Sequence, residues 1–194
     1  MNLIKKRLAK LRKLKMEIAM EMAESLIRKA EKKDFPAIKN LLSTYFLDLE
    51  GLKAEEFILA EKAGRIIGCT AMITTKKNER RGERRYEQVF LEIHSIAIHP
   101  SFRGKGIGRK LIENLITTIK TSTIETSSDQ KPARKFPPPE LQTLELYVRT
   151  TAPGFFEKLG FEKLPPSKKQ ELWNDCTQCE LFEKCTQTVL KYPG

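Results

Sequence analysis

A glycine-rich turn between a predicted strand and a predicted helix is the segment best suited to chemistry. It consists of Arg103, Gly104, Lys105, Gly106, Ile107, Gly108 and Arg109. Glycines allow backbone N–H groups to approach a ligand closely, and the N-terminus of the following helix adds about half a positive charge. The two arginines and the lysine add further positive charge to the turn. The turn is therefore predicted to bind an anion, and its shape suits a pyrophosphate.

Two common phosphate-binding motifs do not fit this turn. The P-loop pattern Gly-x4-Gly-Lys-Ser/Thr is absent, and the dinucleotide fingerprint needs a third glycine where Arg109 stands. The pattern that fits is Arg/Gln-x-x-Gly-x-Gly/Ala, present as Arg103, Gly106 and Gly108. This pattern resembles the acetyl-CoA pyrophosphate loop of the GNAT superfamily of N-acetyltransferases. The resemblance implies an acetyl-CoA-dependent N-acetyltransferase that acetylates a primary amine.

The resemblance extends over about residues 25–192. Three further segments resemble GNAT elements in the same order: 27–38, 66–69 and 155–161. In the tail, Leu172–Cys185 resembles short, stand-alone N-acetylglutamate synthase-type enzymes, although Glu180 stands where proline is usual. This implies the α-amine of glutamate or another small amino acid as one acceptor. A protein N-terminus or lysine, and a non-catalytic acyl-CoA-binding regulatory module, stay open as alternatives.

Candidate catalytic residues lie on the strand before the turn and on a later strand. Glu92 and His94 alternate along the strand, so they share one face, and either could deprotonate the amine. By resemblance, the backbone of Ile96, Ala97 and Ile98 would hold the pantetheine arm and polarise the thioester. Many GNAT enzymes have a tyrosine in the late helix. This chain has Phe155 and Phe156 there, which we count among the cofactor contacts, and Tyr147 is the nearest alternative acid for the leaving thiolate.

The elements that position these residues alternate between strands and helices. Strands are predicted at 25–30, 57–61, 66–73, 88–98 and 144–148, from 161 onward, and as an edge strand at 188–192. Helices are predicted from the N-cap Asp34 to Tyr45, at 106–120 and at 153–159. Charged residues predict a loop at 76–86, and prolines and polar residues predict a mobile loop at 121–140. The fold class is α/β (α+β), and the resemblance implies a GNAT fold with a mixed, twisted sheet of six to seven strands and about four flanking helices.

The N-terminal residues 1–24 form a separate predicted segment, followed by the GNAT domain at 25–194. The formal net charge of the chain is +11, and the first 15 residues contain seven Lys or Arg and no acidic residue. Apolar residues recur at helical spacing, which predicts a basic amphipathic helix. Docking on its own domain, a homodimer and a membrane surface are open alternatives, and nucleic acid is not expected as a partner.

The number of cysteines and the hydropathy of the chain predict the cellular compartment of the protein. The chain has four cysteines and no run of 18 apolar residues, so we expect a cytoplasmic protein with no membrane span and no secretory signal. Cys69 is predicted to be a small core residue. Within the tail segment 173–187, Cys176, Cys179 and Cys185 have compact spacing, for which a metal site, a disulfide and reduced thiols are alternatives. No metal ligand is assigned.

Overall fold

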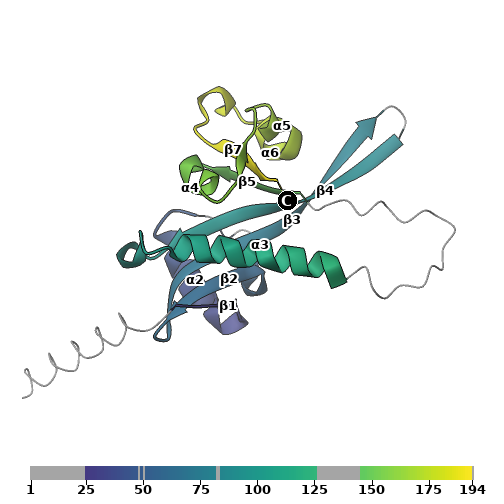
Figure 1. Cartoon of the computed structure of the whole chain (residues 1–194). Coiled ribbons are helices and arrows are strands. Elements are labelled where there is room, and N and C mark those ends of the chain that lie inside the picture. Colours follow the sequence, from purple (N-terminus) through teal and green to yellow (C-terminus); the bar gives the residue numbers. More distant parts are fainter. Residues whose placement is uncertain (1–24, 48, 50, 82–83, 126–144, 194) are drawn as a thin grey trace, which may run out of the picture. The chain divides into compact units, whose positions relative to one another are not determined.

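The computed structural model describes residues 25–47, 49, 51–81, 84–125 and 145–193. Their strands form one seven-stranded mixed sheet of order β1-β2-β3-β4-β5-β7-β6 (Figure 1). The strands are β1 (Leu26–Lys29), β2 (Phe57–Lys62), β3 (Arg65–Arg81), β4 (Arg84–Ile98), β5 (Leu146–Thr150), β6 (Glu162–Lys163) and β7 (Thr188–Tyr192). The α-helices are α2 (Phe35–Ser43), α3 (Ile107–Glu125), α4 (Pro153–Glu157), α5 (Lys168–Leu172) and α6 (Asn174–Thr177). The predicted α/β class and mixed sheet of six to seven strands are confirmed, with five α-helices among the described residues.

Contacts divide the chain into two compact units. The first comprises residues up to Thr70 together with Ile96–Thr118, and the second comprises Ala71–Ser95 together with Ile119–Gly194. Strand β4 therefore has its last three residues in the first unit and the preceding ones in the second.

In the first unit, β1 pairs antiparallel with β2, from Leu26 opposite Glu61 to Lys29 opposite Ile58. One apolar cluster contains side chains from β2, β3 and the start of α3: Ala60, Ile67, Phe102, Ile107 and Leu111, with Ile27, Ile58 and Ile98 packed against them. Burial of such side chains stabilises the unit by about 1.5–3 kcal/mol each. The cluster thus anchors the glycine turn at two positions: Phe102, which directly precedes it, and Ile107, which lies within it.

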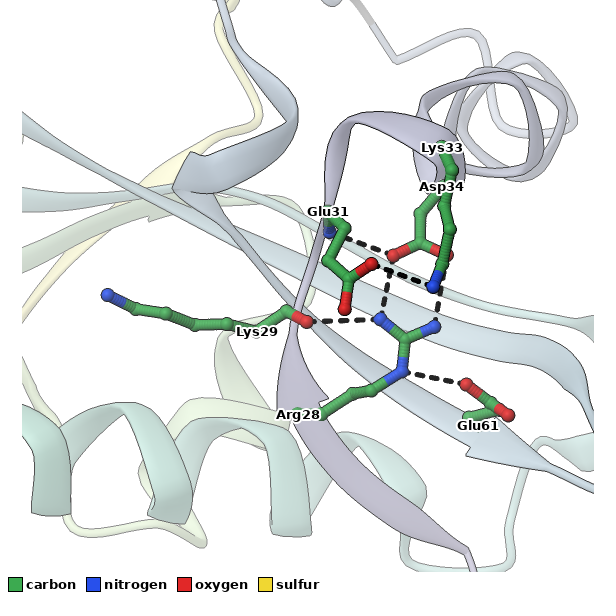
Figure 2. Close-up of polar contacts among 6 residues, drawn as sticks. All are labelled: Arg28, Lys29, Glu31, Lys33, Asp34 and Glu61. Atoms are coloured by element: carbon green, nitrogen blue, oxygen red, sulfur yellow. Dashed lines mark hydrogen bonds and ion pairs between the residues drawn. The ribbon is translucent and has the colours of Figure 1, made fainter.

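The start of α2 is held by a half-buried ion-pair cluster (Figure 2). Arg28 donates to both carboxylate oxygens of Asp34 at 2.7 and 3.0 Å and to Glu61 at 2.7 Å. Asp34 precedes α2 as predicted, but its side chain does not cap that helix, because it accepts from Arg28 and from the backbone N–H of Glu31 instead. A bidentate charge-assisted pair is stronger than a neutral capping bond. The Arg28 hydrogen bond lowers the pKa of Asp34 to about 2.

In the second unit, β4 pairs parallel with β5, and β7 pairs antiparallel with β5 and β6. Its core cluster contains three aromatic rings and three smaller side chains: Phe90, Tyr147, Leu172, Trp173, Cys176 and Val189. Strand β7 has the predicted bounds, but its assignment as an edge strand is wrong, since it lies between β5 and β6. The two-residue β6 pairs with its other side, and so short a strand gives little sequence signal for pairing.

Two predicted loops are also corrected. Residues 76–86 were expected to be a loop, but β3 continues to Arg81 and β4 begins at Arg84. Backbone pairing uses N–H and C=O groups, which charged residues possess as fully as apolar ones. The loop expected at 121–140 starts too early, because α3 continues to Glu125. Serine and threonine lower helix propensity by only tenths of a kcal/mol each, roughly, so they do not end a helix alone.

The rest of that predicted loop, residues 126–144, lies outside the described residues, as does the predicted N-terminal helix at 1–24. In the part of the chain that the structure describes, no helix is long and apolar enough to cross a membrane.

Candidate functional site

The glycine turn has the backbone geometry that its sequence predicts. Gly104 and Gly106 have φ angles of +74° and +76°, a region that glycine adopts without strain. Helix α3 begins directly afterwards at Ile107, and its 19 residues give it a full helix dipole. The N–H groups of its first turn have no acceptor within the helix, which is the arrangement that binds phosphate oxygens.

Side chains of the turn place positive charge around these N–H groups. The Arg103 guanidinium carbon lies 4.5 Å from the centre of the Tyr45 ring, and Lys105 Nζ lies 5.5 Å from that of Phe102. Arg109 forms an exposed pair with Glu113 at 3.4 Å. An exposed ion pair of this kind stabilises a helix by about 0.3–0.5 kcal/mol. Breaking it so that Arg109 can bind an anionic ligand therefore costs little.

The end of β4 is fixed on both sides. His99 N–H donates to the Ile67 carbonyl of β3 at 2.8 Å, and the Ile98 carbonyl accepts from the Tyr45 hydroxyl. Gly68 permits a close approach here, because a Cβ atom at Gly68 would lie 2.8 Å from Ile98 Cδ1 and 3.2 Å from Ile107 Cγ2. In the first unit, the structure thus brings together Ile96, Ala97, Ile98 and the turn.

Tyr45 contacts this segment, and the sequence analysis did not include it among the candidate site residues. It contacts the Ile98 carbonyl with its hydroxyl and Arg103 with its ring. The sequence contains only a tyrosine at the end of a predicted helix, and no pattern links it to residues more than fifty positions later.

In the second unit, Glu92 is a buried carboxylate with several partners. It is 4% exposed, and its Oε2 accepts from the indole N–H of Trp173 at 2.6 Å and from the Thr75 hydroxyl at 3.4 Å. Its Oε1 lies 3.7 Å from Nε of Arg149. The predicted base is therefore a carboxylate that already accepts hydrogen bonds and faces a cation.

Arg149 connects this carboxylate to the C-terminal segment. Its guanidinium donates to Asp175 at 2.6 Å and to Cys176 Sγ at 3.3 Å, and its Cζ lies 4.7 Å from the Trp173 ring centre. Burial opposes the charged form, but the bonds to Asp175 and Cys176 and the charge of Glu92 outweigh it and raise the pKa of Arg149. The arginine thus stays charged.

His94 differs from Glu92 in that one of its ring nitrogens has no hydrogen-bond partner among the described residues. It follows Glu92 by two positions in β4, and its Nδ1 is buried with no hydrogen-bond partner among the described residues. A buried ring nitrogen without a partner carries a desolvation cost, so it gains from any donor that a substrate supplies.

Tyr147 and the phenylalanine pair occupy defined positions in the same unit. Tyr147 is opposite Glu92 in the β4–β5 register, and its hydroxyl donates to Glu145 at 2.6 Å. Burial first, and then the bond to Glu145, raise the pKa of Tyr147, so the phenol stays protonated. Phe156 in α4 is buried, with its ring against those of Phe155 and Phe161.

The cysteines, all within the described residues, are free thiols. No group of three His, Cys, Asp or Glu side chains placed to hold a metal ion is found in that part of the chain. Cys69 is fully buried, as predicted for a core residue, and burial raises its pKa to about 12.

Comparisons with known proteins converge on one fold. Residues 53–163, more than half of the chain, match the family model described as "Acetyltransferase (GNAT) domain". An uncharacterized N-acetyltransferase of Chlorobaculum tepidum is 25% identical over 181 residues, covering 88% of this chain and 97% of the relative. An amino-acid acetyltransferase of Mycobacterium tuberculosis is 24% identical over 150 residues, covering 72% and 69%.

A solved structure is also similar. N-acetylglutamate synthase from Neisseria gonorrhoeae, complexed with coenzyme A and N-acetyl-glutamate, gives a TM-score of 0.53 at 17% identity. The match covers 87% of this chain and 35% of that one, so this chain spans about a third of that protein. At this identity the likeness shows a shared fold.

Proposed function

The chain belongs to the GNAT family of acetyltransferases, and on that premise we propose that it transfers the acetyl group of acetyl-CoA to the α-amine of an amino acid. One observation carries the cofactor assignment. The turn 103–109 joins two glycines of positive φ to the N-terminus of a 19-residue helix, with three cations in seven residues. That arrangement suits the pyrophosphate of CoA.

The reaction needs one nucleophilic attack and two proton movements. The neutral amine attacks the thioester carbonyl, a C–N bond forms, and the C–S bond breaks as the CoA thiolate leaves. The amine gives up a proton, and the thiolate gains one. Backbone N–H groups at the end of β4, around Ile96 to Ile98, would stabilise the developing oxyanion.

For the base we propose His94, with Glu92 holding the local structure. Oε2 of Glu92 accepts from Trp173 and Thr75, and Oε1 faces Arg149 at 3.7 Å, whereas Nδ1 of His94 has no partner among the described residues. Tyr147 would be a proton donor to the thiolate only after releasing its bond to Glu145.

The amino-acid acceptor is supported by two observations. One is the name of the Mycobacterium tuberculosis relative, an amino-acid acetyltransferase. The other is the Trp-Asn-Asp-Cys segment in the tail, which resembles N-acetylglutamate synthase-type enzymes and contributes Trp173 as a donor to Glu92. Glutamate is the first acceptor to test.

The test combines cofactor binding with an acceptor screen. Gly106→Glu should abolish CoA binding in calorimetry, because it places a carboxylate in the anion site and forces a side chain into positive φ. Gly64→Glu is the matched control: Gly64 has φ +73° in the β2–β3 turn, and, as at Gly106, nothing lies within 4 Å of its Cβ position. It should lower stability similarly yet leave CoA affinity intact.

Thiol release from acetyl-CoA should then depend on glutamate or another amino acid. Equal CoA affinity in both glycine variants would contradict the cofactor assignment. Turnover with peptide N-termini or lysine side chains, but with no amino acid, would contradict the acceptor assignment.

A further inference from the structure

Tyr45 is placed by a strained turn at the end of α2. Phe46 N–H donates to Ser43 and Leu47 N–H donates to Leu42, both at 3.2 Å, which is the bond pair of a Schellman turn. The turn requires a left-handed residue, and here that residue is Phe46, with φ of 54° and 98% exposure. Glycine adopts this conformation more readily than phenylalanine does. The backbone is therefore strained at Phe46, the residue that follows Tyr45.

Helix α2, which precedes the turn that contains Tyr45, is fixed within its unit. Ile38 and Leu42 of α2 are fully buried, and Arg28 of β1 binds Asp34 at the other end of the helix (Figure 2). Tyr45 lies in the turn that directly follows this helix, two residues after Ser43, so packing and charge fix the segment from which the turn begins.

Tyr45 contacts two separate parts of the cofactor turn. Its hydroxyl donates to the carbonyl of Ile98, the last residue of β4, and its ring lies against the guanidinium of Arg103. The first contact fixes the strand end that precedes the turn. The second holds the arginine that opens the Arg-x-x-Gly-x-Gly pattern.

We propose that Tyr45 is a positioning residue for acetyl-CoA, which sets the end of β4 for the pantetheine arm and Arg103 for the pyrophosphate. The proposal rests on the function proposed above. Neither the sequence pattern nor the comparisons assign this role to Tyr45. Because its two contacts differ in chemistry, they can be removed one at a time.

Tyr45→Phe removes the hydrogen bond and keeps the ring beside Arg103. We expect it to weaken CoA binding about 3- to 10-fold, the usual effect of one lost hydrogen bond. Tyr45→Leu also removes the ring and should weaken CoA binding about 10- to 30-fold, since an exposed cation–π contact adds a further few-fold.

Pantetheine, which lacks the pyrophosphate, separates the two contacts. Both variants should weaken pantetheine binding equally, whereas the additional loss in Tyr45→Leu should occur with CoA alone. That additional loss should also disappear in an Arg103→Ala background, because the ring then has no guanidinium to hold. A residue needed only for stability would show neither the ligand selectivity nor the coupling.

Tyr192→Phe in β7 is the control for the loss of a tyrosine hydroxyl, and thermal unfolding shows whether each variant is folded.

The role of Tyr45 is refuted, while the proposed function stands, if the wild-type chain binds CoA and both Tyr45→Phe and Tyr45→Leu bind it as well as the wild type does. If Tyr45→Leu loses affinity equally for CoA and pantetheine, its action through Arg103 is refuted. If the wild-type chain binds no CoA, the proposed function itself fails. Should Tyr45→Leu not fold, the Tyr45→Phe comparison still decides the hydrogen bond.

Discussion

Glu92 and His94 lie two residues apart on β4, yet their surroundings suit them to different tasks. Glu92 is buried, accepts from Trp173 and faces Arg149. Such a carboxylate holds a network together, and removing its charge leaves a buried arginine with less compensation. His94 has a buried Nδ1 without a partner among the described residues, and it is the residue that we propose as the base.

We therefore expect that a glutamine substitution at His94 lowers turnover, whereas one at Glu92 lowers stability. His94→Gln should lower kcat by about 10²- to 10⁴-fold with little change in the free energy of unfolding, since positioned proton transfer is usually worth that much. Glu92→Gln should lower the free energy of unfolding by about 1–3 kcal/mol, because Gln still accepts from Trp173 but does not compensate Arg149.

Steady-state kinetics and urea unfolding measure both quantities. If Glu92→Gln were as stable as the wild type but lost turnover, while His94→Gln kept it, Glu92 would be the base instead.

Asp34 gives a second prediction at this scale, concerning acid stability. Its pKa is lowered from 3.8 to about 2, chiefly by the Arg28 hydrogen bond. Because the folded pKa lies below the unfolded one, the contribution of Asp34 is complete above about pH 4 and is lost as the pH falls towards 2. Asp34→Asn should lower the free energy of unfolding by about 2 kcal/mol at pH 7 and by much less near pH 2.

Urea midpoints at pH 7 and near pH 2 would measure this difference. Exposed Glu31→Gln serves as the control, since its pair with Lys33 is solvent-exposed and contributes little. A constant gap between wild type and Asp34→Asn at the two pH values would show that Asp34 does not titrate with folding.

At the scale of elements, the close approach of β3 to the start of α3 decides the geometry of the cofactor turn. Gly68 faces Ile98, Ile107 and Leu111 at distances that leave no room for a Cβ. A Cβ atom there would require the side chains of Ile98, at the end of β4, and Ile107, within the turn, to shift. Packing at this contact thus links β3 to the cofactor site.

Gly68→Ala should lower the free energy of unfolding by about 1–3 kcal/mol through overpacking. It should also weaken CoA binding several-fold, because the side chains that must move are those of Ile98 and Ile107. Thermal unfolding and calorimetry measure the two effects. Gly154→Ala is the control, as its Cβ would meet only Glu157 at 3.8 Å. Wild-type affinity in Gly68→Ala would mean that the turn does not depend on this contact.

At the scale of the whole molecule, Tyr45 and the turn 103–109, which are proposed to bind the cofactor, lie in the first unit. Neither lies in the basic segment 1–24, for which we propose a role separate from cofactor binding. Deleting residues 1–20 should therefore leave CoA affinity within about two-fold of wild type and change the solubility or oligomeric state. Calorimetry and light scattering measure these outcomes, and loss of CoA binding by a folded truncation would contradict the separation.

The sequence by itself determined the cofactor turn and most of the elements around it. The glycines of the turn, the helix after it and the bounds of β7 depend on local requirements: positive φ, helix start signals and alternation. Such requirements involve only a few neighbouring residues, so they can be predicted from a single sequence. The same local reading failed for residues 76–86, where composition suggested a loop but two strands pair through their backbones.

Tertiary structure alone decided which side chains meet. The Tyr45 hydroxyl and the Ile98 carbonyl are 53 positions apart, and Trp173 and Glu92 are 81 positions apart. No local preference records such pairs, because they arise only when sheet register and helix packing bring distant segments together. For the same reason Glu92 reads in the sequence as a plausible base, whereas in the fold it is a buried carboxylate held by Trp173 and Arg149.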